Sequence, residues 1–164
     1  MVQSAFSSEV DRSIKALVDA VTSSPCSIAT AESLTGGQLA AAISAAPNAS
    51  NWYKGGVVAY QPDVKHGLLE TPPGPVVTAD TATAMAVSIA RLLGARFSVA
   101  VTGVGGPEPE DGQPPGTVFL STFKDGENAE VTGFEFAGEP IEIIEQTICA
   151  ALRALAGRIS SAKL

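Results

Sequence analysis

Short apolar segments alternate with segments of helical period through the first hundred residues, and this alternation restricts the fold more than any other feature. Three apolar segments predict strands, at residues 27–31, 56–60 and 97–101. Apolar residues at helical spacing predict helices at 14–21, 38–46, 62–69 and between Thr78 and Gly94. Because such apolar strands are buried on both faces, helices must cover both faces of the sheet.

The last third of the chain follows a different pattern. Segments 117–123 and 131–136 alternate in polarity around a polar turn, which predicts a β-hairpin, and a final helix starts at Pro140. With 164 residues, 45% of them hydrophobic, the chain can bury one core without disulfides or metals. The sequence therefore predicts an α/β fold, a three-layer α/β/α sandwich with a mixed central sheet, in a single domain over residues 1–164.

The charge balance restricts the partners. Seventeen acidic and ten basic side chains give a net charge of −7, which repels nucleic acid and anionic lipid. We therefore expect no nucleic-acid or membrane partner, although a local cation or helix N-terminus can still bind an anionic small molecule. Residues 1–11 lack the pattern of a signal peptide, so we expect a cytoplasmic protein, and homo-oligomers are common among small enzymes.

The cysteines and the histidine offer no metal or disulfide framework. Cys26 and Cys149 lie far apart in sequence, no CxxC motif is present, and His66 is the only histidine. We expect two buried free thiols and a histidine at the surface rather than a catalyst.

Three junctions between a strand and the following element carry candidate functional groups. In open α/β sheets, sites form where strands end and helices begin. The junctions are residues 33–37, with a serine beside two glycines, residues 60–65, with a tyrosine and a lysine, and the turn at 102–107. Free amides at the first junction can bind an oxyanion or a phosphate.

Each junction also has an ordinary explanation. Ser33 can simply cap a helix, Lys65 can be a solvated helix lysine, and Tyr60 a half-buried strand aromatic. Glu32 can tie down the turn by hydrogen bonding or take part in chemistry. The glycines at 103–106 are not a dinucleotide fingerprint, because acidic residues and prolines follow where a helix N-terminus is required.

Three motifs, taken together and in order, favour a functional role for these residues over the ordinary explanations. The segments are Ala31–Gly37, Gly55–Tyr60 with Lys65, and Val101–Pro107 followed by residues 116–118. Over roughly residues 29–155 the chain resembles the CinA C-terminal domain family, which includes stand-alone nicotinamide-nucleotide amidohydrolases. Three spaced motifs are far more specific than one.

The resemblance implies a reaction and a set of residues. It implies deamidation of nicotinamide mononucleotide to nicotinate mononucleotide and ammonia, without metal or organic cofactor. Ser33 would be the nucleophile, Lys65 its base if burial lowers the lysine pKa, and Tyr60 would orient the lysine or relay a proton. The amides near Gly36, Gly37 or 103–106 would stabilise the oxyanion. The substrate-binding set would be Glu32, Thr35, Gly36, Gly37, Thr102, Gly103, Gly105 and Gly106.

One segment departs from the family pattern. Where family members often carry a Gly-Asp-Arg-like stretch at the last helix, this chain reads Gly138, Glu139, Pro140, Ile141. Losing a bidentate guanidinium removes about 1.5 to 3 kcal/mol of binding to a phosphate. Residues 108–111 add acidic charge beside the expected pocket. Two alternatives therefore stay open: a non-catalytic domain that binds nucleotides or a partner, and a Ser-Lys hydrolase of another small amide.

Overall fold

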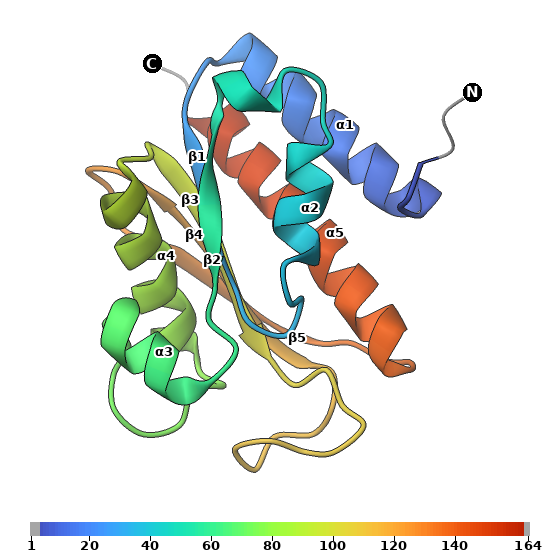
Figure 1. The fold of residues 1–164 in the computed structure, drawn as a ribbon, viewed down its shortest axis with the longest axis vertical. Coiled ribbons are helices and arrows are strands. Elements are labelled where there is room, and N and C mark those ends of the chain that lie inside the picture. Colours follow the sequence, from blue (N-terminus) through green and yellow to red (C-terminus); the bar gives the residue numbers. More distant parts are fainter. Residues whose placement is uncertain (1–3, 163–164) are drawn as a thin grey trace.

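Five α-helices cover the two faces of a five-stranded sheet in the computed structural model, which describes residues 4–162 (Figure 1). The first face carries α1 (Ser8–Ser23), α2 (Gln38–Ser44) and α5 (Pro140–Ser161), and the second carries α3 (Pro62–Leu68) and α4 (Ala79–Leu93). The strands are β1 (Ile28–Glu32), β2 (Tyr53–Val58), β3 (Phe97–Gly103), β4 (Thr117–Lys124) and β5 (Glu130–Glu135). The predicted three-layer α/β/α sandwich is confirmed.

The order of the strands brings the three candidate junctions to one edge of the sheet. The order is β2-β1-β3-β4-β5, in which β1 runs parallel to both β2 and β3, while β4 is antiparallel to β3 and to β5. The sheet is therefore mixed, as expected. Because β1, β2 and β3 point the same way, the segments that follow Glu32, Val58 and Gly103 all leave the sheet at its carboxyl edge.

Two apolar cores lie on opposite faces of the sheet. Between the sheet and α1, α2 and α5, the core includes Leu17, Leu152 and Leu155, none of which is exposed. Between the sheet and α4, Met85 and Ile89 form a smaller core with alanines of β1 and β3. Each helix that faces the sheet thus buries its apolar stripe, which is the reason for the helical spacing seen in the sequence.

The ends of the helices and strands follow the sequence signals closely, with one shift. Thr78 accepts a hydrogen bond from the Thr81 amide and Gly94 adopts a left-handed conformation, so α4 is capped at the two residues between which a helix was predicted. Strand β2, expected at residues 56–60, instead spans Tyr53–Val58. The shift arises from pairing with β1, whose residues Ile28 to Glu32 pair with Tyr53 to Val58. Within this pairing, Gly56 lies so close to Thr30 that a Cβ atom would stand 2.2 Å from the Thr30 hydroxyl.

Both cysteines are free, but only one is fully buried. Cys149 is buried in α5, whereas Cys26 is half-buried before β1, so the expectation of two buried thiols is wrong for Cys26. His66 is half-buried and shares a 2.8 Å hydrogen bond with the Thr71 hydroxyl. Within residues 4–162, no helix combines the length and the apolar character needed to cross a bilayer.

Candidate active site

A pocket of 420 Å³ lies at the carboxyl edge of the sheet, where the three junctions meet. Ser33 comes from the end of β1, Tyr60 from the segment after β2, and the glycine-rich loop from the end of β3. The start of α5 closes one side. The lining residues are Ser33, Leu34, Tyr60, residues 103–110, Pro140 and Ile144.

Ser33 lines this pocket with a hydroxyl that the protein does not use. The residue is only 6% exposed, yet within residues 4–162 its side chain makes no hydrogen bond. It is also not a helix cap, because α2 begins after Gly37, whose left-handed conformation provides the N-cap without any side-chain bond. The ordinary explanation of Ser33 as a cap is therefore wrong, and its hydroxyl is free of protein partners among the described residues at the pocket.

Glu32 takes the role of an internal cap. Its carboxylate is 1% exposed and accepts hydrogen bonds from the Thr35 hydroxyl at 2.6 Å and from the amides of Gly37, Leu39 and Ala40 at 2.9 to 3.2 Å. Both carboxylate oxygens are thereby occupied by the protein. Of the two roles left open for Glu32, the structure shows the one in which it ties down the turn.

This cap overturns one expectation about the amides at the start of α2. The Gly37 amide donates to Glu32 and the Gly36 amide donates to the Ser33 carbonyl, so neither is free to bind an oxyanion or a phosphate. The carboxylate of Glu32 already satisfies the positive end of the helix, which is the physical reason for the correction. Thr35 is buried beside it and does not line the pocket.

Other backbone amides remain available at the pocket. Among the backbone hydrogen bonds of residues 4–162, none has the amide of Leu34, Gly105 or Gly106 as donor. All three residues line the pocket that contains the Ser33 hydroxyl. Leu34 was missed from the sequence, although an amide directly after a nucleophile is a common oxyanion donor and could have suggested it.

Lys65 lies inside the protein, which rules out the alternative of a solvated helix lysine. It is 1% exposed, and its ammonium nitrogen donates a 3.2 Å hydrogen bond to the Tyr60 carbonyl. Burial lowers the pKa of Lys65 below its ordinary value, while the carboxylates of Glu110 and Asp111 partly offset this shift. Lys65 does not line the pocket itself but contacts the backbone of Tyr60, which does.

The Tyr60 side chain is exposed at the rim. It lies beyond the end of β2 and is 67% exposed, so the alternative of a half-buried strand aromatic is wrong. The phenol faces solvent at the pocket while the carbonyl of the same residue holds the buried amine. The structure thus brings Ser33 and Tyr60 into one pocket and places Lys65 directly beneath Tyr60.

Two further residues of the expected substrate-binding set, Thr102 and Gly103, have structural roles. Thr102 is 1% exposed and its hydroxyl donates to the Val76 carbonyl at 2.9 Å, away from the pocket. Gly103 lines the pocket at the point where β3 leaves β4, and a Cβ atom there would stand 2.6 Å from the Thr117 carbonyl oxygen. Gly103 is required for this close approach of the two strands.

One carboxylate of the acidic loop after β3 binds the loop to the backbone of residues 76–77. Asp111 accepts hydrogen bonds from the Val76 and Val77 amides at 2.7 and 3.0 Å. Glu108 and Glu110 stay exposed and line the pocket. Asp111 therefore positions the loop, and the two glutamates give the pocket its charge.

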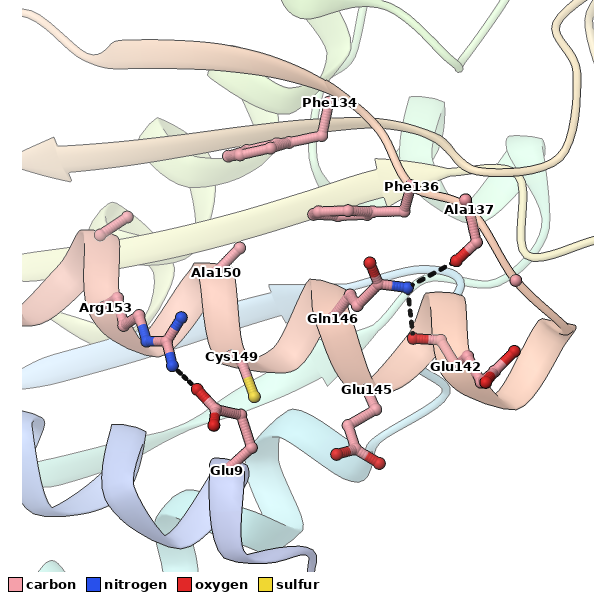
Figure 2. A pocket seen from close by; sticks show the side chains of 12 residues that line it. Glu9, Phe134, Phe136, Ala137, Glu142, Glu145, Gln146, Cys149, Ala150 and Arg153 are labelled. Atoms are coloured by element: carbon pink, nitrogen blue, oxygen red, sulfur yellow. Dashed lines mark hydrogen bonds and ion pairs between the residues drawn. The ribbon is translucent and has the colours of Figure 1, made fainter.

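A larger hollow of 1070 Å³ lies elsewhere, along the outer side of α5 (Figure 2). It runs between α5, β5 and the start of α1, under the stacked rings of Phe134 and Phe136. Arg153, the one cation among the described residues that line it, forms an ion pair with Glu9. None of the residues expected to be functional lines this hollow, so the smaller pocket is the candidate site.

Fold and pocket together define a class: a three-layer α/β/α protein with a serine at the carboxyl edge of its parallel strands, whose hydroxyl has no hydrogen-bond partner among residues 4–162. The model of the CinA C-terminal domain family matches residues 11–159. The chain belongs to the CinA C-terminal domain family.

Relatives and solved structures agree with this membership. A protein of Halalkalibacterium halodurans, named as a competence-damage inducible protein, is 36% identical over 138 residues, which are 80% of this chain and 33% of that protein. The chain thus spans about a third of the length of the curated relatives it matches. A competence or damage-inducible protein of Enterobacter asburiae has a TM-score of 0.87 at 31% identity, covering 92% of this chain and 98% of that one. One of Klebsiella pneumoniae has a TM-score of 0.88 at 29% identity, covering 94% and 99%.

Proposed function

We propose that this protein is an amidohydrolase in which Ser33 attacks a carboxamide and Lys65 serves as its base. The resemblance of its motifs to nicotinamide-nucleotide amidohydrolases makes nicotinamide mononucleotide the first substrate to test. One observation carries the proposal: an amine that is 1% exposed, with a lowered pKa, lies beneath the pocket that holds an unpaired serine hydroxyl.

The chemistry follows from these groups. A neutral Lys65 accepts the Ser33 proton while the serine oxygen attacks the carboxamide carbon, and the amides of Leu34, Gly105 and Gly106 donate to the oxyanion. The lysine ammonium then protonates the departing nitrogen, with the Tyr60 phenol at the rim as the relay. Water hydrolyses the resulting ester of Ser33. The products are a carboxylate and ammonia, and the serine regains its proton.

Ammonia release from nicotinamide mononucleotide tests the proposal most directly. The Ser33→Ala variant should lose at least about 10³-fold in kcat/KM, because the nucleophile is gone. Ser50→Ala, at an exposed serine outside the pocket, is the matched control and should keep the wild-type rate. Circular dichroism confirms that each variant is folded.

Two results would contradict the proposal. Unchanged turnover in Ser33→Ala would mean that water attacks the amide directly. A folded wild-type protein that releases no ammonia from the nucleotide, the nucleoside or nicotinamide would favour a domain that binds without turnover.

A further inference from the structure

The candidate pocket carries negative charge and no positive charge. Its lining contains the carboxylates of Glu108 and Glu110, and it includes no lysine, arginine or histidine among the described residues. The nearby amine of Lys65 is buried beneath Tyr60 rather than in the pocket wall. A phosphate at this site would thus meet two carboxylates and no facing cation.

Helix N-termini, the other usual means of holding a phosphate, are also occupied here. At α2 the carboxylate of Glu32 accepts from the Gly37, Leu39 and Ala40 amides. At α5 the first helical residue is Pro140, which has no N–H, and Glu139 forms a capping box with Glu142. Both helix starts beside the pocket therefore already interact with carboxylates of the chain.

The rest of the pocket suits an uncharged or positively charged ring. Leu34, Pro140 and Ile144 form an apolar wall, and Ser33, a residue that is 6% exposed, supplies a hydroxyl that has no partner among residues 4–162. The carboxylates lie at the exposed loop, where they attract a cation and repel an anion. An apolar wall with an acidic rim matches a flat cationic ring that bears an amide.

We propose that the preferred substrate is a carboxamide on a positively charged ring without a phosphate: a pyridinium carboxamide nucleoside rather than its 5′-phosphate. This inference rests on the proposed Ser33 amidohydrolase function. The net reaction adds water across the amide C–N bond, so that the carboxamide becomes a carboxylate and its nitrogen leaves as ammonia, with no change of oxidation state.

The test compares three amides: nicotinamide riboside, nicotinamide mononucleotide and nicotinamide. The assays contain EDTA, so that no divalent cation bridges phosphate and carboxylate. At low ionic strength, kcat/KM for the riboside should exceed that for the nucleotide by about tenfold or more, and added salt should narrow the ratio because exposed charges are screened. Neutral nicotinamide should show little dependence on salt.

Variants of the rim assign the preference to named charges. The double variant Glu108→Gln and Glu110→Gln should reduce the riboside-to-nucleotide ratio by about tenfold, and Glu108→Arg should reverse the ratio. Glu135→Gln, an exposed carboxylate on β5 outside the pocket, is the control and should leave the ratio unchanged.

Binding measurements separate this inference from the proposed reaction. Calorimetry on Ser33→Ala should show tighter binding of the riboside than of the nucleotide, whether or not the wild type turns either over. Ser33-dependent hydrolysis that prefers the nucleotide, or a ratio that the rim variants do not change, would overturn the inference while the amidohydrolase stands. Absence of turnover combined with riboside binding would sink the proposed reaction and leave the pocket preference intact. Equal or no binding of the two compounds would overturn the preference.

Discussion

Glu32 and Lys65 are both charged side chains that are 1% exposed, but the protein treats them in opposite ways. Glu32 accepts four hydrogen bonds, which satisfy both of its oxygens. Among residues 4–162, the Lys65 side chain has one hydrogen bond, to a carbonyl at 3.2 Å, although an ammonium has three donors. The hydrogen-bonding capacity of Glu32 is therefore filled by the protein, whereas that of Lys65 is not.

The difference separates a structural charge from a reactive one. A buried carboxylate with several amide donors is stabilised as an anion and fixes the backbone around it. A buried amine with few acceptors is more easily deprotonated, and its pKa falls. Such a group lowers the stability of the fold, and its place beneath Tyr60 agrees with the proposed role of Lys65 as a base, which needs a neutral amine.

Replacing Lys65 by methionine should have the largest effect, and it should lower activity without lowering stability. The kcat/KM for the amide should fall by about 10³-fold, or ~4 kcal/mol of transition-state free energy, because the general base is lost. The free energy of unfolding should stay the same or rise, because an apolar side chain of similar length removes a buried amine. Urea unfolding and ammonia release measure the two quantities.

The pH dependence of that stability difference gives a control. The folded pKa of Lys65 lies below its unfolded value, so the destabilisation by the lysine is full below the folded pKa and disappears as pH rises to the unfolded value near 10.5. The gain from Lys65→Met should shrink over that range. Lys54→Met, at an exposed lysine of β2, should change neither activity nor stability by a comparable amount. If Lys65→Met lost stability together with activity, Lys65 would be a structural residue.

Glu32→Ala should show the opposite division, with stability as the primary loss. Removing the carboxylate leaves the amides of Gly37, Leu39 and Ala40 without their acceptor, and we expect a loss of about 2 to 4 kcal/mol in the free energy of unfolding. The midpoint of urea unfolding measures it. Glu32→Gln, which keeps one carbonyl oxygen as acceptor, should lose less.

The matched control for this change is Glu135→Ala, since Glu135 is exposed on β5 and should cost under about 0.5 kcal/mol. If Glu32→Ala kept its stability but lost turnover, Glu32 would belong to the chemistry and the contrast with Lys65 would fail.

The sequence predicted the fold in which Glu32 and Lys65 lie, but not the difference between their surroundings. Apolar periodicity identified the layers because it reports burial directly, and Thr78, Gly94 and Pro140 marked helix ends through local rules. Family resemblance drew attention to Ser33 and Lys65. Neither source shows which amides are already bonded, since that depends on how Glu32 folds back on α2 across the turn.

Long-range contacts explain the remaining differences. The burial of Lys65 and the exposure of Tyr60 depend on where the segment after β2 leaves the sheet, and β2 begins and ends earlier than its apolar pattern suggests. Asp111 bonds to amides more than thirty residues away, and no local pattern marks that contact. Contacts of this kind can be identified only once the register of the strands is known.

Glu110→Gln should cause the smallest effect, a shift of the pH profile rather than a loss. If neutral Lys65 is the base, kcat/KM rises with pH as the lysine loses its proton. The Glu110 carboxylate raises the pKa of Lys65 against the effect of burial, so its removal should move the rising limb to lower pH by less than about one unit. Glu108→Gln removes a pocket carboxylate that does not act on Lys65, so its limb should stay in place. The profile is measured with neutral nicotinamide, so that the charge of the substrate does not affect it. A shift of the rising limb in both variants, or in neither, would mean that this limb does not report the protonation of Lys65.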